Sequence, residues 1–338
     1  MLRIVALCVG AALMWAGSAL AAPQLVQNEN GDSALLFDVL AQRRPLQLTT
    51  STPGGVFGPL TTLTRAPVPY DPLQERNVAI DDHGGAVATW IGLNPSGGCP
   101  CVAYVSVKPP GGEFGPPQQL SEVGQDAGAT QVDVNPRGDA IVAWSQSPPH
   151  ALDGVLKYSI RPAGGSFSAP ATLPGPITQD LTVVLDGDGG AEFIGNEAPS
   201  VGLSKSHAVY RRPDGTFEQP VALDPVPDIR SAALAANRHG DVLIAWPENG
   251  RVRARERPAG GTFGAPEIVT TGNDIVPGEA LRAVVNNAGD AAITFDPWWL
   301  VTRAHCGAFG PRQLRPPLAD TLAMNERGDL ALAWVQPA

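Results

Sequence analysis

Two short motifs alternate along this chain, and the alternation limits its possible folds more than any other feature. The first motif has the form Asn/Asp-x-x-Gly-Asp/Gly followed by small or apolar residues. Its copies contain the glycines Gly31, Gly84, Gly138, Gly189, Gly240, Gly289 and Gly328. An aromatic residue recurs six positions after the glycine in every copy except the fourth, which has Gly195. Asn, Asp and Gly tolerate the left-handed backbone of tight turns, so each copy predicts a hairpin turn.

The second motif has the approximate form Gly-Gly-x-Phe-x-x-Pro-x-x-Leu and lies between copies of the first. Its aromatic residues are Phe57, Phe114, Phe167, Phe217, Phe263 and Phe309. Each repeat divides into four short strands, which in the third repeat we expect at 131–134, 140–145, 154–160 and 167–173. The 38 Gly and 34 Pro residues disfavour long helices. Four strands in a repeat of about 40–50 residues predict a β-propeller.

Closure of the ring is not decided by the repeat pattern. The first motif occurs once more often than the second, because the last repeat, from about Thr321, contains only two strands before the end. We therefore predict an all-β β-propeller of four-stranded blades with seven repeats, the last incomplete. The alternative is a six-bladed ring closed by the final hairpin. No spare N-terminal strand is evident that would complete the last blade.

The second motif also carries a family resemblance. The segment from Arg212 to Pro220, which contains Asp214, Gly215 and Phe217, resembles the Asp-box turn of sialidase-like propellers (BNR repeats). Across the chain the match is degenerate, since Asp is present only at Asp214 and Phe replaces the Trp of that family. The resemblance implies a propeller fold in which these turns are structural and lie away from the active site.

The N-terminal segment predicts export. Arg3 precedes an apolar stretch at 4–14, and Ala19-Leu20-Ala21 fits a small-x-small cleavage site. We expect a signal peptide at 1–22 and a single propeller domain at 23–338, secreted or extracytoplasmic and monomeric. The apolar stretch is shorter than the ~20 residues of a membrane span, and no later run reaches that length. The net charge of −10 argues against a nucleic-acid partner, and we expect no cofactor.

Candidate binding residues are expected on the face opposite the motif turns, where the longer loops lie. Trp298, beside Trp299, could stack on a sugar, although a core aromatic residue is the simpler explanation. Near the starts of innermost strands, Arg76, Arg230 and Arg282 could clamp a carboxylate, or could be solvated surface arginines. The interblade links carry carboxylates that could form an acid/base pair or simply an acidic surface, at Asp71, Glu75, Asp126, Asp180, Asp228 and Asp320.

We expect neither a catalytic residue nor a metal site of recognisable type. The recurrent motif Asp is predicted to accept local backbone N–H bonds, including at Asp186-Gly187-Asp188, which superficially resembles a calcium loop. The sequence lacks a Gly-x-Ser-x-Gly elbow and a His-Glu-x-x-His helix. The first hypothesis is an exported, non-catalytic binding module for a glycan or an extracellular protein. The alternative is a glycoside hydrolase or lyase of sialidase-like type, with carboxylates at the channel mouth.

Overall fold

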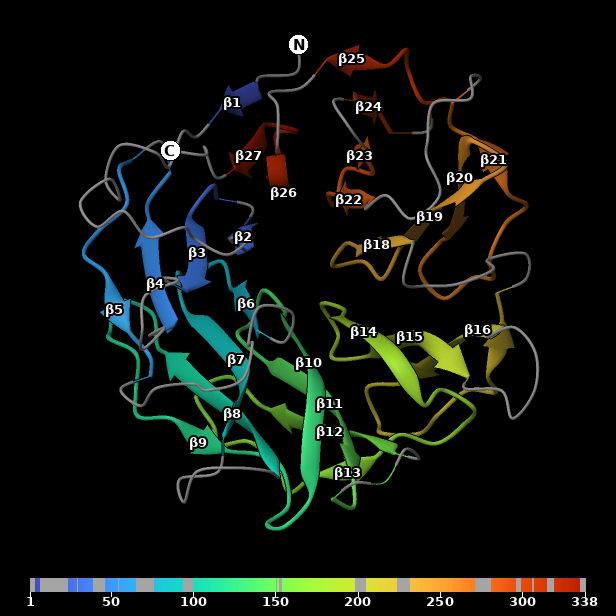
Figure 1. Cartoon of the computed structure of the whole chain (residues 1–338). Coiled ribbons are helices and arrows are strands. Elements are labelled where there is room, and N and C mark those ends of the chain that lie inside the picture. Colours follow the sequence, from blue (N-terminus) through green and yellow to red (C-terminus); the bar gives the residue numbers. More distant parts are fainter. Residues whose placement is uncertain are drawn as a thin grey trace.

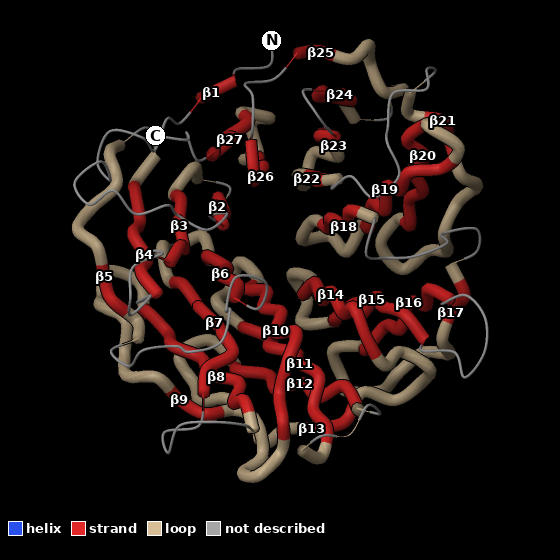
Figure 2. The backbone as a smooth tube through the Cα atoms, viewed as in Figure 1, coloured by secondary structure: helices blue, strands red, loops and turns tan. Residues whose placement is uncertain are grey.

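The protein is an all-β β-propeller. The computed structural model describes residues 4–6, 24–28, 30–38, 46–53, 55–64, 76–93, 100–149, 151, 154–197, 205–223, 232–270, 281–295, 299–305, 307–314 and 319–334. Within these ranges, six four-stranded antiparallel sheets, here called blades 1 to 6, and one smaller terminal sheet surround a central axis (Figure 1). Figure 2 shows strands and loops, with no helix drawn. The predicted fold class is confirmed.

Each blade is one contiguous stretch of sequence, with its strands hydrogen-bonded in chain order. Blade 1 consists of β2 (Gln24–Gln27), β3 (Ser33–Asp38), β4 (Leu46–Ser51) and β5 (Thr61–Thr62). Blade 2 consists of β6 (Arg76–Ile80), β7 (Ala86–Leu93), β8 (Cys101–Lys108) and β9 (Gln118–Gln119). Blade 3 consists of β10 (Asp126–Val134), β11 (Ala140–Ser147), β12 (Val155–Arg161) and β13 (Ala171–Thr172).

The second half of the chain follows the same plan. Blade 4 consists of β14 (Gln179–Leu185), β15 (Ala191–Glu197), β16 (Lys205–Arg211) and β17 (Val221–Ala222). Blade 5 consists of β18 (Ala233–Ala236), β19 (Val242–Glu248), β20 (Arg251–Arg257) and β21 (Glu267–Ile268). Blade 6 consists of β22 (Arg282–Val285), β23 (Ala291–Phe295), β24 (Trp299–Arg303) and β25 (Gln313–Leu314). The terminal sheet consists of β26 (Ala319–Met324), β27 (Leu330–Trp334) and β1 (Ile4–Ala6).

The burial pattern follows from the position of each strand in its blade. The first strands, from β2 to β26, lie nearest the centre, and the short fourth strands lie at the rim (Figure 1). The second strand of a blade is covered on both faces by neighbouring blades, so β11 and β23 each have five consecutive buried residues. This explains why second strands are nearly continuous apolar runs rather than alternating ones.

The aromatic residue of the second strand packs between blades, as the sequence predicts. Trp144 is fully buried against Val87 and Ala103 of blade 2, and Trp246 is packed with Ile194 of blade 4. In the fourth repeat, where Gly195 replaces the aromatic residue, Phe193 fills the interface with blade 3. Residues two apart on a strand share a face, so this shift preserves the packing.

The terminal sheet closes the ring by apolar packing. Leu25 and Phe37 of blade 1 pack against Ala323 and Ala331, and on the other side Leu300 of blade 6 packs against the same sheet. The last repeat thus contributes two strands, as predicted. The expectation that no N-terminal strand joins this sheet was wrong, because β1 pairs with β27 in parallel. β1 lies inside the predicted signal peptide, so a cleaved chain would lack this pairing.

Candidate functional site

The first-motif turn is held together by its own Asn. In blade 3, Oδ1 of Asn135 accepts the N–H groups of Arg137 and Asp139 at 3.1 and 3.0 Å. Its Nδ2 donates to the carboxylate of Asp139 at 3.0 Å. The other oxygen of Asp139 accepts the N–H of Ala163, in the second-motif turn, at 2.9 Å. The two motif turns therefore lie on the same face, here called the motif face, and the motif Asp has the predicted structural role.

The same Asn also joins neighbouring blades. Nδ2 of Asn135 donates to the carbonyl of Asp186 in blade 4 at 3.2 Å. Equivalent bonds run from Asn28 to Asp81, from Asn237 to Asn286, and from Asn286 to Asn325. In blade 4 the carboxylate of Asp186 instead accepts two backbone N–H groups and the Tyr210 hydroxyl. The described residues contain no group of three His, Cys, Asp or Glu arranged to hold a metal ion.

On the motif face, the central channel opens into a polar cavity of about 260 Å³ lined by the first strands of all seven sheets. Arg238 of blade 5 reaches across to form an ion pair with Asp82 of blade 2. Both carboxylate oxygens of Glu326 lie 3.0 Å from the N–H of Asn287. These carboxylates are already engaged, so the described part of this mouth offers no exposed acid/base pair.

Asp133 on β10 lines the same cavity. Its carboxylate accepts the N–H groups of Leu185 at 2.7 Å and of Val134 at 2.9 Å. Burial raises the pKa of Asp133 to about 6, although these two hydrogen bonds act in the opposite direction. Because its oxygens are committed to the backbone of blades 3 and 4, this carboxyl group stabilises the join between two blades.

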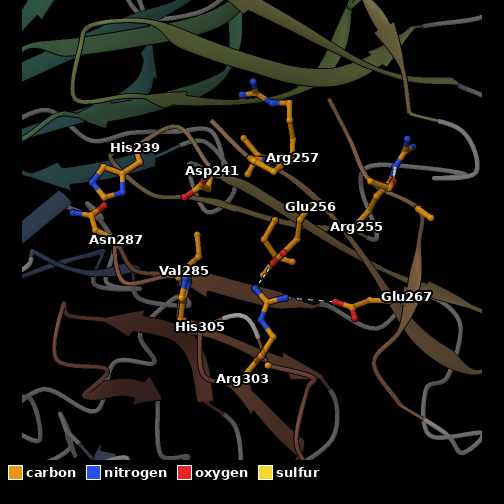
Figure 3. Close-up of a pocket in the computed structure, with 17 residues that line it drawn as sticks. His239, Asp241, Arg255, Glu256, Arg257, Glu267, Val285, Asn287, Arg303 and His305 are labelled. Atoms are coloured by element: carbon orange, nitrogen blue, oxygen red, sulfur yellow. Dashed lines mark hydrogen bonds and ion pairs between the residues drawn. The ribbon is translucent and has the colours of Figure 1, made fainter. Parts of the chain in front are cut away.

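A larger cavity, of about 650 Å³, lies between blades 5 and 6 on the motif face (Figure 3). Blade 5 contributes its first-motif turn and the end of β20, including His239, Asp241 and Glu256. Blade 6 contributes residues from β22, β24 and its turns, including Asn287 and Arg303. In Figure 3, His239 and Asn287 lie beside each other at one side and Arg303 lies between two carboxylates.

The guanidinium group of Arg303 organises this cavity. It forms an ion pair with Glu256, lies 3.5 Å from Glu267, and stacks over the Phe309 ring with its Cζ 5.0 Å from the ring centre. The Arg303 side chain is only 8% exposed, so its position is restricted. Burial raises the pKa of Glu267, against the lowering effect of the nearby Arg303. The cavity therefore contains a buried cation between two partly exposed carboxylates, Glu256 (40% exposed) and Glu267 (43% exposed).

Arg257, which follows Glu256 at the end of β20, faces the opposite way, toward blade 4. It lies 2.7 Å from the carboxylate of Glu192 and 5.4 Å from the centre of the Tyr210 ring. Burial raises the pKa of Glu192 to about 7, although the Arg257 charge lowers it. This buried pair bridges blades 4 and 5.

Sequence reasoning missed the pattern to which Arg257 and Arg303 belong. A basic residue ends the third strand of every blade from 2 to 6, at Lys108, Arg161, Arg211, Arg257 and Arg303. Each stands four positions before a glycine of the second motif. The signal was present in the repeat, but its importance depends on the stacking of the blades, which places cations of consecutive blades in the lining of shared cavities.

The predicted site residues are not brought together by any described contact. Arg76 is buried at the start of β6, opposite Trp90 in the strand register. Arg282 is exposed at the start of β22 and donates to the carbonyl of Leu281 at 2.9 Å. Arg230 and Trp298 lie outside the described residues. The carboxylate-clamp and sugar-stacking hypotheses therefore stay predictions.

The remaining predictions on the opposite face are tested only in part. The carboxylate of Asp126 accepts the N–H of Cys101 at 2.7 Å, which is a structural role. Asp71, Glu75 and Asp228, and the side chains of Asp180 and Asp320, lie outside what the structure describes. Several loops of that face fall in the same gaps, whereas the cavities described above lie on the motif face.

Comparison with known proteins supports the fold alone. No family model matches the chain, and no curated protein matches it either. Among solved structures, a Hadza microbial sialidase aligns with a TM-score of 0.52 and 14% identity, over 81% of this chain and 63% of its own length. The chain thus spans less than two thirds of that sialidase. Without a matching family, the Asp-box assignment stays a prediction.

Two further structures are similar at still lower identity. The β-propeller domain of the Trilobed protease from Pyrococcus furiosus, described as having an open velcro topology, has a TM-score of 0.55 and 8% identity, covering 91% of this chain and 89% of that one. An ulvan lyase of polysaccharide lyase family PL25 has a TM-score of 0.50 and 9% identity, covering 92% and 79%. The described residues contain no helix that is long and apolar enough to cross a membrane.

Proposed function

We propose that this protein is an exported, non-catalytic binding propeller whose ligand is a glycan, held in the cavity between blades 5 and 6. The observation that carries the proposal is the cavity itself, with Arg303 fixed between Glu256 and Glu267. Its volume of about 650 Å³ falls within the roughly 300–1,000 Å³ typical of small-molecule sites. Neighbouring hydroxyl groups of a sugar can donate to the partly exposed carboxylates that Arg303 holds in place.

The chemistry of the lining also favours a polar, hydroxyl-rich ligand. His239 and His305 are exposed at the cavity, and Asn287 adds an amide, beside apolar residues that include Leu243 and Val285. Two structural neighbours are named as a sialidase and an ulvan lyase, and both names denote carbohydrate substrates. That likeness is an analogy of fold, which makes glycans the first ligand class to test.

The test is binding of the purified, processed protein to an array of neutral, carboxylated and sulfated glycans. We expect a specific hit whose affinity falls about 10-fold or more in the rim variant H239A/N287A and in R303Q. The matched control is R251Q, which removes an exposed arginine at the start of β20, outside the lining of the cavity. No hit on the array would reject the glycan proposal in favour of a protein ligand. A hit that both variants retain would place the site elsewhere, with Arg76 and Arg282 of the opposite face to be tested next.

A glycoside hydrolase or lyase is the second candidate, because Glu256 and Glu267 share one arginine in this cavity and burial raises the pKa of Glu267. Such an enzyme would release shorter or unsaturated sugars from the bound glycan, detectable by mass spectrometry, and E267Q would abolish the release. Unchanged glycan after prolonged incubation favours the binding module.

The export part of the proposal has its own test. Cleavage after Ala21 or Ala22 would give a protein that begins at Ala22 or Pro23, as measured by intact mass of the protein recovered outside the cytoplasm. Light scattering of the same sample would check the expected monomer.

A further inference from the structure

A second interblade cavity, of about 250 Å³, lies between blades 2 and 3 on the motif face. It occupies the same place in the repeat as the cavity between blades 5 and 6. His83 stands at the position of His239, in the third residue of the first motif. The cations Lys108 and Arg161, which end the third strands of blades 2 and 3, correspond to Arg257 and Arg303.

The two cavities differ in their acidic residues. Arg303 contacts Glu256 and Glu267, but Val107 and Gln118 stand at the corresponding positions of blade 2. Arg161 and Lys108 therefore line a cavity whose neighbouring wall is apolar, formed by Val87 and Val107.

The cations of this cavity are held by carbonyl groups rather than by carboxylates. Nζ of Lys108 donates to the carbonyl of Gly84 at 2.8 Å, and a guanidinium N–H of Arg161 donates to the carbonyl of Gly138 at 3.4 Å. In the part of the chain that the structure describes, neither side chain forms an ion pair. The site is therefore built from oriented cations that retain N–H groups for a further acceptor.

A third cation, Arg137, stands at the rim, where its guanidinium group lies 3.1 Å from Asp139 and remains 53% exposed. The opposing charge is Asp81, whose carboxylate accepts the N–H groups of His83 and Gly85 at 2.8 Å. Three cations against the charges of Asp81 and Asp139 leave one excess positive charge at this cavity, within a chain of net charge −10. It is also smaller than the ~300 Å³ lower limit of ordinary ligand pockets, so it suits one charged group rather than a whole oligosaccharide.

We propose that the cavity between blades 2 and 3 binds an oxyanion, a carboxylate or sulfate group, either as a free ion or as the end group of a larger ligand. The planar guanidinium of Arg161 offers paired N–H donors that match two oxygens of such a group, and Lys108 adds a point charge. This site is separate from the proposed glycan cavity and does not depend on it.

The test is calorimetric titration of the purified, processed protein with sodium sulfate and sodium acetate at constant ionic strength. We expect saturable binding that weakens about 10-fold or more in R161Q and in K108Q. The matched control is R327Q, because Arg327 pairs with Asp329 at 3.0 Å in the equivalent turn of the terminal sheet, as Arg137 does with Asp139. R161K, which keeps the charge, should retain part of the affinity and serves if R161Q does not fold.

A sulfated and a carboxylated monosaccharide, each compared with its neutral parent sugar, distinguish the two sources of the anion. Binding of free sulfate alone indicates a small-ion site, and binding of the charged sugars as well indicates an end group of a larger ligand; both outcomes support the proposal. No saturable binding of either anion, unchanged affinity in folded R161Q and K108Q, or equal binding of the neutral sugar would overturn it.

Discussion

The first and fifth positions of the first motif are coupled, and this coupling can be measured. Every copy that begins with Asn ends with Asp, and the two that begin with Asp, at Asp81 and Asp186, end with glycine. In blade 5, Nδ2 of Asn237 donates to Asp241 at 2.8 Å and to the carbonyl of Asn286 at 3.1 Å. A carboxylate at position 237 would lose both donations and face the carboxylate of Asp241.

The expected cost of Asn237→Asp follows from these contacts. Two lost hydrogen bonds contribute about 1 kcal/mol each. Two like charges about 4 Å apart at an effective dielectric constant of 20 repel by about 4 kcal/mol, which decreases as the side chains move apart. We expect N237D to lower the free energy of unfolding by roughly 3–5 kcal/mol at pH 7. The loss should shrink at a pH low enough to protonate one carboxylate.

In the N237D variant, the second substitution Asp241→Gly should remove the repulsion. It recreates the combination of Asp at the first motif position and Gly at the fifth that blades 2 and 4 have. A Cβ on Gly190 would lie 2.5 Å from a carboxylate oxygen of Asp186, which explains why that copy has glycine. D241G alone removes two hydrogen bonds to the carboxylate, one donated by Nδ2 of Asn237 and one donated by the N–H of Ala259. It should therefore lower the free energy of unfolding by about 2 kcal/mol. The double variant should then be less destabilised than the sum of the single variants by about 3 kcal/mol.

Urea unfolding of the four proteins in this cycle measures the coupling. N249D, which adds the same charge at an exposed turn of blade 5, is the control and should shift stability by less than about 0.5 kcal/mol. Additive effects of N237D and D241G, or an N237D variant as stable as the control, would refute the repulsion argument.

Three further predictions concern packing, closure and pH. Trp246→Ala should lower the free energy of unfolding by about 3–5 kcal/mol, because the side chain is fully buried between blades 4 and 5; a loss below about 1 kcal/mol in urea unfolding would contradict this packing. Removing residues 1–22 should leave the melting temperature unchanged, because closure depends on contacts such as Phe37 with Ala331 rather than on β1; a large decrease in calorimetry would show that β1 is required. Because burial raises the pKa of Glu192 to about 7, the folded state binds its proton more tightly than the unfolded state, so this group's contribution to stability is present at low pH and is lost as pH rises toward 7. E192Q should flatten the pH dependence of urea unfolding between about pH 5 and 7 relative to the native protein, and an identical profile would count against the shifted pKa.

The propeller fold is determined by local sequence. Each blade is contiguous, its turns contain Asn, Asp and Gly at fixed positions, and its second strand is an apolar run ending near a Trp or Phe. A repeat that cannot bury its own faces must stack against its neighbours, so strand number and stacking follow from the pattern. The structural role of the motif Asp followed from the same reasoning, since side chains that accept nearby N–H groups act within a few residues.

The candidate sites were decided by tertiary structure, because they form between blades. Arg303 meets Glu256 across 47 residues of sequence, and Arg238 meets Asp82 across 156. The coupled positions of the first motif and the basic end of the third strand were visible in the repeat. Their structural roles depend on which atoms come within about 3 Å of one another when the blades stack. Periodicity specifies the face on which a side chain lies, whereas only the packed ring specifies the charge it meets there.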